Sequence, residues 1–335
     1  MKTITKGKNM NNFKKVGLTA LAGSLAAISA HAAEMTVNGA TMLTYTTEDK
    51  TEVTGNQWGM KTNLAFTASG EVNGYTVSYM QTSQDQFAGM SSARLSMDMG
   101  DAGVLAFDQG SGSGLATIDD KTPTAAEEIW DGLDGLTVGG LVGAAGNSGV
   151  FNYINTFAGL KLNAAARSGS GAKSADGASS AGGGDAWDFA ITGNASDALA
   201  YGIGYGESDA GDQGVDSDNV HSTIFANYTM GPVTFGYQHS NIDNGAAAGI
   251  DEITDAFGIA LNVNDNLSVS YGEREVEYAN NSAAHITEKG EGIAVAYTMG
   301  SIKIAGNRNE VVANNNSLAA SAQDAMTEIA ISFAF

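Results

Sequence analysis

The sequence ends on TEIAISFAF, residues 327–335, a stretch in which the side chains alternate strictly between two faces. On an extended strand, Ile329, Ile331 and Phe335 fall on one face, and smaller or polar residues fall on the other. Soluble domains usually finish in a polar, frayed tail, and an apolar edge strand in water promotes aggregation. We therefore expect the apolar face of this strand to be buried in a sandwich or to meet something other than water.

The opposite end of the chain has the order of a secretory signal peptide. Residues 1–33 contain five Lys and no acidic residue, with Lys14 and Lys15 directly before the apolar run VGLTALAGSLAAIS (16–29). The small residues of AHA (30–32) then offer a cleavage site. The apolar run is too short to cross about 30 Å of hydrocarbon, which argues against a spanning helix. A buried N-terminal helix is the weaker alternative.

This reading divides the chain into a signal peptide, residues 1–32, and one domain, residues 33–335. Residues 1–9 read as an upstream extension, because Met10 would start a signal of more ordinary length. Without the first 33 residues the chain has 11 basic and 37 acidic residues, a net charge of −26. Such a surface repels nucleic acid. The lack of Cys excludes a disulfide framework and fits a Gram-negative envelope protein or a secreted halophile-like enzyme.

Two-residue alternation recurs along the rest of the chain and predicts β-strands. In WGMKTNLAFTA (58–68), for example, Trp58, Met60 and Phe66 share one face, and Lys61 lies on the other. Sixteen stretches follow this pattern: 35–45, 58–68, 75–81, 93–99, 103–109, 149–155, 160–167, 186–193, 199–206, 220–229, 233–239, 252–263, 267–277, 291–299, 301–307 and 325–335.

The connections between these stretches alternate in length. Tight turns such as EVNG (71–74) and GDAG (100–103) alternate with long polar segments such as 168–185 and 278–290. Short turns at one end and long loops at the other are typical of an outer-membrane β-barrel. In lipid every backbone polar group must be paired, so a sheet can cross only by closing on itself. We therefore predict an all-β, transmembrane antiparallel barrel of about sixteen strands, in which fourteen or eighteen would survive a few boundary errors.

Three stretches after the signal peptide are distinctive: the terminal ISFAF, the strand–turn–strand segment NSGVFNYINTFAGLKLNAAAR (147–167), and the strands that precede a long loop at about 108–147. Through these stretches the chain after the signal peptide resembles the general porins of Gram-negative bacteria. Asn155-Thr156 stands where the family often has Ser-Pro, a small departure. The terminal signal alone is shared by many barrels, whereas the second stretch is more specific.

The resemblance implies a water-filled channel for passive diffusion of ions and small hydrophilic solutes, without catalysis and without a cofactor. It also implies a homotrimer embedded in outer-membrane lipid and lipopolysaccharide. The family's assembly machinery reads the closing strand, so Phe333 and Phe335 are expected to serve as the assembly signal.

The long loop 108–146 matches in position the third loop of the family, which folds into the barrel and narrows it. Thr122-Pro123-Thr124 followed by AAEEIW has the cap, the proline and the first-turn acids of a helix start. The alternative is a solvated extracellular loop. The acids expected at the constriction are Asp119, Asp120, Glu127, Glu128, Asp131 and Asp134.

Six basic residues lie on the polar faces of their predicted strands, so we expect them to point into the lumen. Rings of charge in a pore set its ion selectivity. At the constriction the basic residues and the loop acids nearly balance. The remaining acidic residues lie largely in the long loops at the mouth of the pore, where a negative potential enriches cations. We therefore predict a weak to moderate preference for cations. The alternative is that these basic residues are merely solvated and have no effect on selectivity. The predicted basic wall comprises Lys61, Arg94, Lys161, Arg167, Arg274 and Lys303.

Other motifs in the sequence give little support for catalysis or metal binding. GSGSG (110–114) has Gly112 where a nucleophile elbow needs Ser, and the three His after the signal peptide follow no metal-ligand spacing. The acidic segment 207–218 could hold Ca²⁺ but lacks the EF-hand pattern. The alternative functions are an exported soluble β-sandwich, such as an adhesin or carbohydrate-binding protein, and a barrel enzyme. The latter needs a nucleophile with a His partner, which the sequence does not reveal.

Overall fold

The structure, a computed structural model, describes most of the chain after the predicted signal peptide. The predicted signal peptide and Asp134 lie outside the described residues. The described residues are 34–50, 54–83, 89–133, 139–146, 148–169, 184–209, 218–245, 249–279, 286–313, 317 and 322–335.

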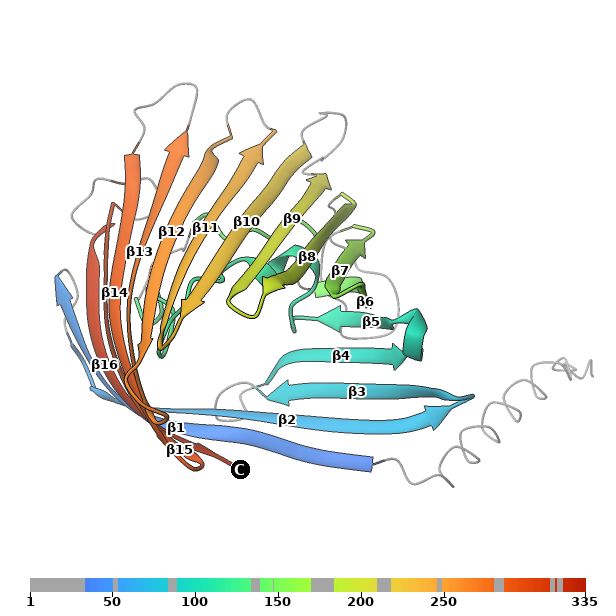
Figure 1. Cartoon of the computed structure of the whole chain (residues 1–335), viewed down its shortest axis with the longest axis horizontal. Helices are drawn as coiled ribbons and strands as arrows, with labels where there is room; N and C mark the ends of the chain where they lie inside the picture. Colours follow the sequence, from blue (N-terminus) through green and yellow to red (C-terminus); the bar gives the residue numbers. More distant parts are fainter. Residues whose placement is uncertain are drawn as a thin grey trace, which may run out of the picture.

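Sixteen antiparallel strands form one closed barrel, and each of the sixteen predicted strands is found (Figure 1). Every strand pairs with its neighbours in the sequence, and the first pairs with the last. The strands are β1 Glu34–Lys50, β2 Trp58–Val72, β3 Tyr75–Ser83, β4 Met90–Asp98, β5 Val104–Gln109, β6 Ser148–Phe157, β7 Leu160–Arg167, β8 Ala186–Ser196, β9 Leu199–Asp209, β10 Asp218–Met230, β11 Val233–Asn244, β12 Asp251–Asn262, β13 Leu267–Ala279, β14 Ile286–Met299, β15 Ile302–Val312 and β16 Asp324–Ala334.

The seam between β1 and β16 reaches the last residue of the chain. Phe335 and Gly39 exchange two backbone hydrogen bonds, with N···O distances of 2.9 and 3.0 Å. From there the ladder continues from Ala40 opposite Ala334 to Lys50 opposite Asp324. The alternating strand that ends the sequence therefore has neighbours on both sides, β1 and β15, and presents no open edge.

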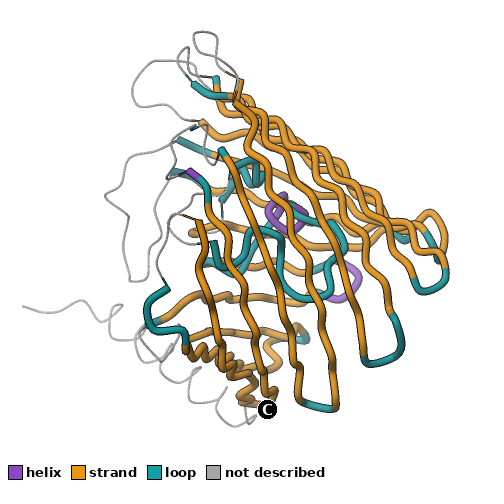
Figure 2. The backbone as a smooth tube through the Cα atoms, turned by 90° about the vertical axis from the view of Figure 1, so that its left-hand side faces the viewer, coloured by secondary structure: helices purple, strands orange, loops and turns teal. Residues whose placement is uncertain are grey.

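The wall of the barrel is uneven in height. Strands β3, β4 and β5 have 9, 9 and 6 residues, whereas β12, β13 and β14 have 12, 13 and 14. Figure 1 shows the long strands from β9 to β14 rising above the short ones. Figure 2 shows that the segment between β5 and β6 runs inside the curve of the sheet.

The strands have their apolar side outside, which is the reverse of a water-soluble barrel. On β14, Ile293 and Val295 are 57% and 44% exposed, whereas Glu288 points inward and is 3% exposed. The same reversal repeats around the sheet, with large apolar side chains exposed on β1 to β12 and on β14 to β16. The two-residue period of the sequence thus separates an apolar outer face from a polar inner face.

The predicted helix after Thr122-Pro123-Thr124 is wrong. The described residues contain no α-helix, only two 3₁₀ turns, Gly100–Ala102 and Gly114–Ile118, and residues 122–133 form bends and turns. The Asp131 N–H donates to the Glu128 carbonyl three residues back at 3.0 Å, as in a turn, and the Ala125 N–H donates to Ser270 Oγ of β13 at 2.8 Å. None of the described residues belongs to a helix long and apolar enough to cross a membrane.

Candidate functional site

The interior of the barrel is occupied by the segment between β5 and β6. We call residues 110–146 the inner loop; its described parts are 110–133 and 139–146. Its partners on the wall are inward-facing residues of β4 to β16, which alternate with the outward apolar side chains. The loop therefore lies against the inner face of the wall.

Asp188 of β8 holds the two limbs of the inner loop together. Its Oδ1 accepts a hydrogen bond from the Leu115 N–H at 3.0 Å, and its Oδ2 accepts one from the Ala145 N–H at 2.7 Å. The Asp188 residue is 1% exposed. Gly114 passes so close that a Cβ there would lie 1.7 Å from Asp188 Oδ1. One carboxylate thus joins the start and the end of the loop to the same strand.

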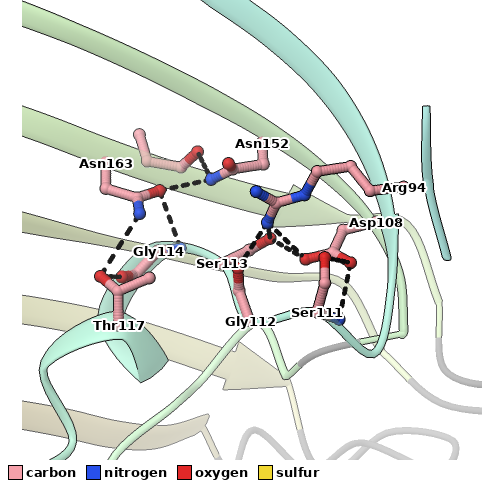
Figure 3. Close-up of polar contacts among 10 residues, drawn as sticks. Arg94, Asp108, Ser111, Gly112, Ser113, Gly114, Thr117, Asn152 and Asn163 are labelled. Atoms are coloured by element: carbon pink, nitrogen blue, oxygen red, sulfur yellow. Dashed lines mark hydrogen bonds and ion pairs between the residues drawn. The ribbon is translucent and has the colours of Figure 1, made fainter. Parts of the chain in front are cut away.

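A second anchor lies where the inner loop leaves β5 (Figure 3). Arg94 of β4 donates to Asp108 Oδ2 at 2.8 Å and also reaches the Gly112 carbonyl and Ser113 Oγ. The Asp108 carboxylate, fully buried, accepts further bonds from Ser111 and Ser113. Arg94 is therefore engaged in holding the loop rather than free in the lumen.

Asparagines of the neighbouring strands continue this network. Asn163 of β7 accepts a hydrogen bond from the Gly114 N–H at 3.0 Å and donates to Thr117 Oγ1 at 3.3 Å (Figure 3). Asn152 of β6 donates to the same Asn163 oxygen. Leu115, next to Gly114 in the chain, belongs to a buried apolar cluster that also contains Ile118, Val142, Ala190 and Phe225.

Gln238 of β11 binds the outgoing limb of the loop through both ends of its amide. Its Nε2 donates to the carbonyls of Ile118 and Asp119 at 2.8 and 3.0 Å, and its Oε1 accepts from the Lys121 N–H at 2.7 Å. Asn227 of β10 donates to the Lys121 carbonyl at 2.7 Å. Because Gln238 is 2% exposed, these bonds have little competition from water.

The far end of the loop lies against β13 and β15. Asn309 donates to the carbonyls of Glu128 and Asp131 at 3.1 and 2.8 Å. Trp130 stacks on the Arg274 guanidinium, whose carbon lies 5.1 Å from the ring centroid. Arg274 is 4% exposed and pairs with Glu288 at 3.1 Å. This arginine therefore supports the loop from the wall.

The returning limb is bound to β10 and β12. The Gly140 N–H donates to the Glu252 carboxylate, and Thr254 Oγ1 donates to the Gly140 carbonyl at 3.4 Å. The Gly143 N–H donates to His221 Nδ1 at 3.3 Å. The loop is thus attached along both limbs rather than only at its ends.

Acidic side chains of the inner loop gather where it faces the lumen. Burial raises the pKa of Glu127 and of Asp131 above the ordinary values of such carboxyls. Neighbouring acids raise the pKa of Glu127 further, while Lys303 and Lys61 oppose the shift. Lys61 likewise opposes the rise in the pKa of Asp131. Burial also raises the pKa of Asp119 and Asp120.

The six basic residues of the predicted wall have different surroundings. Lys61 and Lys303 lie within electrostatic reach of the loop acids. Arg94 and Arg274 are ion-paired to Asp108 and Glu288. The other two, Lys161 and Arg167, are on β7, and within the described part of the chain no ion pair joins either to a loop acid.

One acid beside this group was not singled out from the sequence. Glu328 of β16 accepts a hydrogen bond from Thr46 Oγ1 at 3.0 Å and lies within electrostatic reach of Asp131, Glu127 and Lys61. Its position on the polar phase of the terminal strand was the available signal. The described residues contain no group of His, Asp and Glu side chains that could hold a metal ion.

Comparison with solved structures identifies the architecture. An anion-selective porin from Comamonas acidovorans superposes with a TM-score of 0.64 at 14% identity, covering 90% of this chain and 100% of that one. The fold is that of the sixteen-stranded porins. OmpT of Vibrio cholerae in its trimer form gives a TM-score of 0.63 at 14% identity over 91% of this chain and 100% of its own.

The outer membrane channel DcaP of Acinetobacter baumannii shares the porin fold as well. It gives a TM-score of 0.64 at 14% identity, covering 90% of this chain and 97% of that chain. No protein-family model matches the sequence, and no curated protein matches it. At this level of identity the similarity establishes the architecture alone.

Proposed function

We propose that the chain forms a water-filled pore through the outer membrane of a Gram-negative bacterium, for passive diffusion of ions and small hydrophilic solutes. The observation that carries the proposal is the belt of large apolar side chains exposed on nearly every strand of a closed sheet. A soluble protein rarely exposes so continuous an apolar surface. A closed antiparallel barrel with this belt fits hydrocarbon, because its backbone is paired within the sheet.

We propose that the inner loop is the constriction of this pore. Its attachments to Gln238, Asn309 and Glu252 support this role, because they hold the loop within the barrel against flowing solute. Ions that pass the loop meet the acids Glu127, Glu128 and Asp131 together with Lys61 and Lys303. No catalytic step and no cofactor form part of the proposal.

The selectivity that this group of charges supports is a weak preference for cations. Arg94 and Arg274 are neutralised by their own carboxylate partners, which leaves the two lysines facing a larger number of acids. Glu328 adds a negative charge on the same part of the wall as the two lysines, because β16 lies between β15 and β1. Charge rings of this kind act on ions through the local potential.

The remaining parts of the proposal concern assembly. We propose export through cleavage of the signal peptide 1–32, insertion by the outer-membrane assembly machinery, contact with lipid and lipopolysaccharide, and a homotrimer. The trimer form of OmpT from Vibrio cholerae supports the last point by analogy of fold. Phe333 and Phe335 would supply the assembly signal.

A planar-bilayer recording in a salt gradient tests the function, because conductance reports a pore and reversal potential reports its selectivity. Stepwise current increases with a weakly cation-selective reversal potential are expected. An exported soluble β-sandwich, the alternative, would give no current steps, and it would neither sediment with outer membranes nor show heat-modifiable mobility on gels.

A charge variant tests the proposed constriction directly. Replacing Asp119, Asp120, Glu127 and Glu128 by Asn or Gln is expected to move the reversal potential toward anions. A matched set of four acids on the outward face, with Glu273, Glu275, Glu277 and Glu291 replaced by Gln, is expected to leave it nearer the original value. If the two sets had equal effects, the inner loop would not be where ions are selected.

A further inference from the structure

Four glycines lie side by side on the inner wall of the barrel. Gly236 of β11 is opposite Gly258 of β12, Gly258 is opposite Gly272 of β13, and Gly272 is opposite Gly292 of β14. We call these four residues the glycine row. They face inward, because flanking residues such as Phe257 and Ile293 are exposed on the outer face.

The backbone itself does not require glycine at these positions. None of the four has a positive φ, although many glycines elsewhere in the described chain do. Glycine inside a strand is unfavourable compared with residues that pack a side chain, and it often marks a place where another backbone approaches closely. All four residues are buried even though they line the inside of a barrel. Another part of the chain must therefore cover them.

The inner loop occupies the space that side chains would fill. A Cβ on Gly258 would lie 2.9 Å from both the carbonyl oxygen and the Cδ of Pro123. A Cβ on Gly236 would lie 2.2 Å from the Pro123 Cδ. On the other half of the row, a Cβ on Gly272 or Gly292 would lie 2.9 or 3.0 Å from Ile129 Cγ2. Pro123 and Ile129 thus rest directly on the bare backbone of the wall.

Two asparagines in the same row mark its ends. Asn227 is opposite Gly236, and Asn309 is opposite Gly292. Each donates its side-chain amide to loop carbonyls, Asn227 to Lys121 and Asn309 to Glu128 and Asp131. The glycine row is therefore a stretch of wall without side chains that has a hydrogen-bond donor at either end. The two donors bind the two ends of loop segment 121–131.

We propose that the glycine row is a seat that sets how far the inner loop stands from the wall, so that these four positions determine the open width of the pore. The part about width rests on the proposed channel function; the seating of the loop does not. A side chain at the row would push the loop into the lumen. Because unstrained carbon contacts need roughly 3.5–4.0 Å, a methyl on Gly258 requires the loop to move by roughly 0.6–1.1 Å.

Disulfide trapping tests the seat without any measurement of current. The chain contains no Cys, so Ile129→Cys combined with Gly292→Cys introduces one defined pair. A Cβ on Gly292 lies 3.0 Å from Ile129 Cβ, near the range that a disulfide spans after a small adjustment. Oxidation of the folded barrel should cross-link this pair. The control, Ile129→Cys with Gly306→Cys on the outer face of β15, should stay reduced.

Conductance tests the consequence for width. Gly258→Ala is expected to lower single-channel conductance. Gly290→Ala is the matched control, because its new Cβ would find no atom nearer than 3.9 Å. Heat-modifiable mobility shows that each variant has folded. If Gly258→Ala failed to fold, Gly272→Ala would replace it, because there the only contact under 3.4 Å is with one side-chain methyl, Ile129 Cγ2, and not with loop backbone.

The outcomes separate the two proposals. Cross-linking without current in any variant would refute the channel and leave the seat standing. Current without cross-linking of the folded Ile129→Cys, Gly292→Cys barrel would overturn the seat. Equal conductance of Gly258→Ala and Gly290→Ala would overturn the claim that the row sets the width.

Discussion

Replacing Gln238 by Leu should loosen the inner loop while leaving the barrel closed. The amide of Gln238 makes three hydrogen bonds to the loop backbone, at Ile118, Asp119 and Lys121. Leu retains much of the volume of Gln but can make none of them. The β-ladders from β10 to β12 do not use this side chain and should persist.

The expected size follows from the number of bonds. A hydrogen bond in a folded protein contributes about 1 kcal/mol net, so loss of three costs about 3 kcal/mol. Because 1.4 kcal/mol corresponds to a factor of ten, the population of the detached loop should rise about a hundredfold. The free energy of unfolding of the whole barrel should fall by at least the same amount, because the bonds are lost from the folded state, while the ladders between the strands remain.

Two measurements report the detached state. Low-frequency noise of the open-channel current should increase, because a loop that leaves the wall obstructs the pore intermittently. Labelling of Ile118→Cys by a maleimide should also become faster, because residue 118 is only 2% exposed while the loop is attached, and the Cys-free background makes that site unique. Gln81→Leu on β3 is the control, because Gln81 bonds only to Tyr79 among the contacts described for it. Noise and labelling rates equal to those of the control would refute the reasoning.

Three further predictions concern charge and closure. Lys61→Gln should deepen cation preference, because Lys61 opposes the charge of Asp131; a reversal potential that moved toward anions would contradict this. Acidification should weaken cation preference, since burial raises the pKa of Asp119 and Asp131 and these carboxyls become neutral at a higher pH than ordinary ones; a preference that strengthened as pH fell would refute it. Deletion of Phe335 removes its two hydrogen bonds to Gly39 and should lower the yield of heat-modifiable barrel in outer membranes, so an undiminished yield would count against a closing role.

The strands could be predicted because their two faces meet different surroundings. Where both faces are polar, the signal weakens. The sequence predicted a strand over 291–299, yet β14 begins at Ile286. The extra residues carry charge outward as well, since Lys289 pairs with Glu275 on the outer face. Alternation of apolar with polar residues is absent there, but the backbone ladder continues.

The site was less predictable, because alternation gives the face of a residue and not its partner. Arg94 and Lys61 both lie on the polar face of their strands in the sequence, yet only Arg94 forms an ion pair with Asp108. The helix predicted after Thr122 was wrong: Asp131 bonds three residues back to Glu128, and Asn309 of the wall binds the Glu128 and Asp131 carbonyls, a contact that local capping residues do not reveal. The glycine row was invisible, because its members are adjacent only through the register of four strands.

The meeting of Phe335 with Gly39 has a consequence for the time course of folding. The seam joins β1 to β16, the first and the last strand of the barrel, so it has the largest sequence separation among the strand pairs. Pairings so distant in sequence form slowly, because the entropy of loop closure is lost before any contact compensates for it. Until then both terminal strands have unsatisfied edges, and another copy of the chain competes for them. The two terminal strands therefore have to be kept from pairing with another copy until the barrel closes.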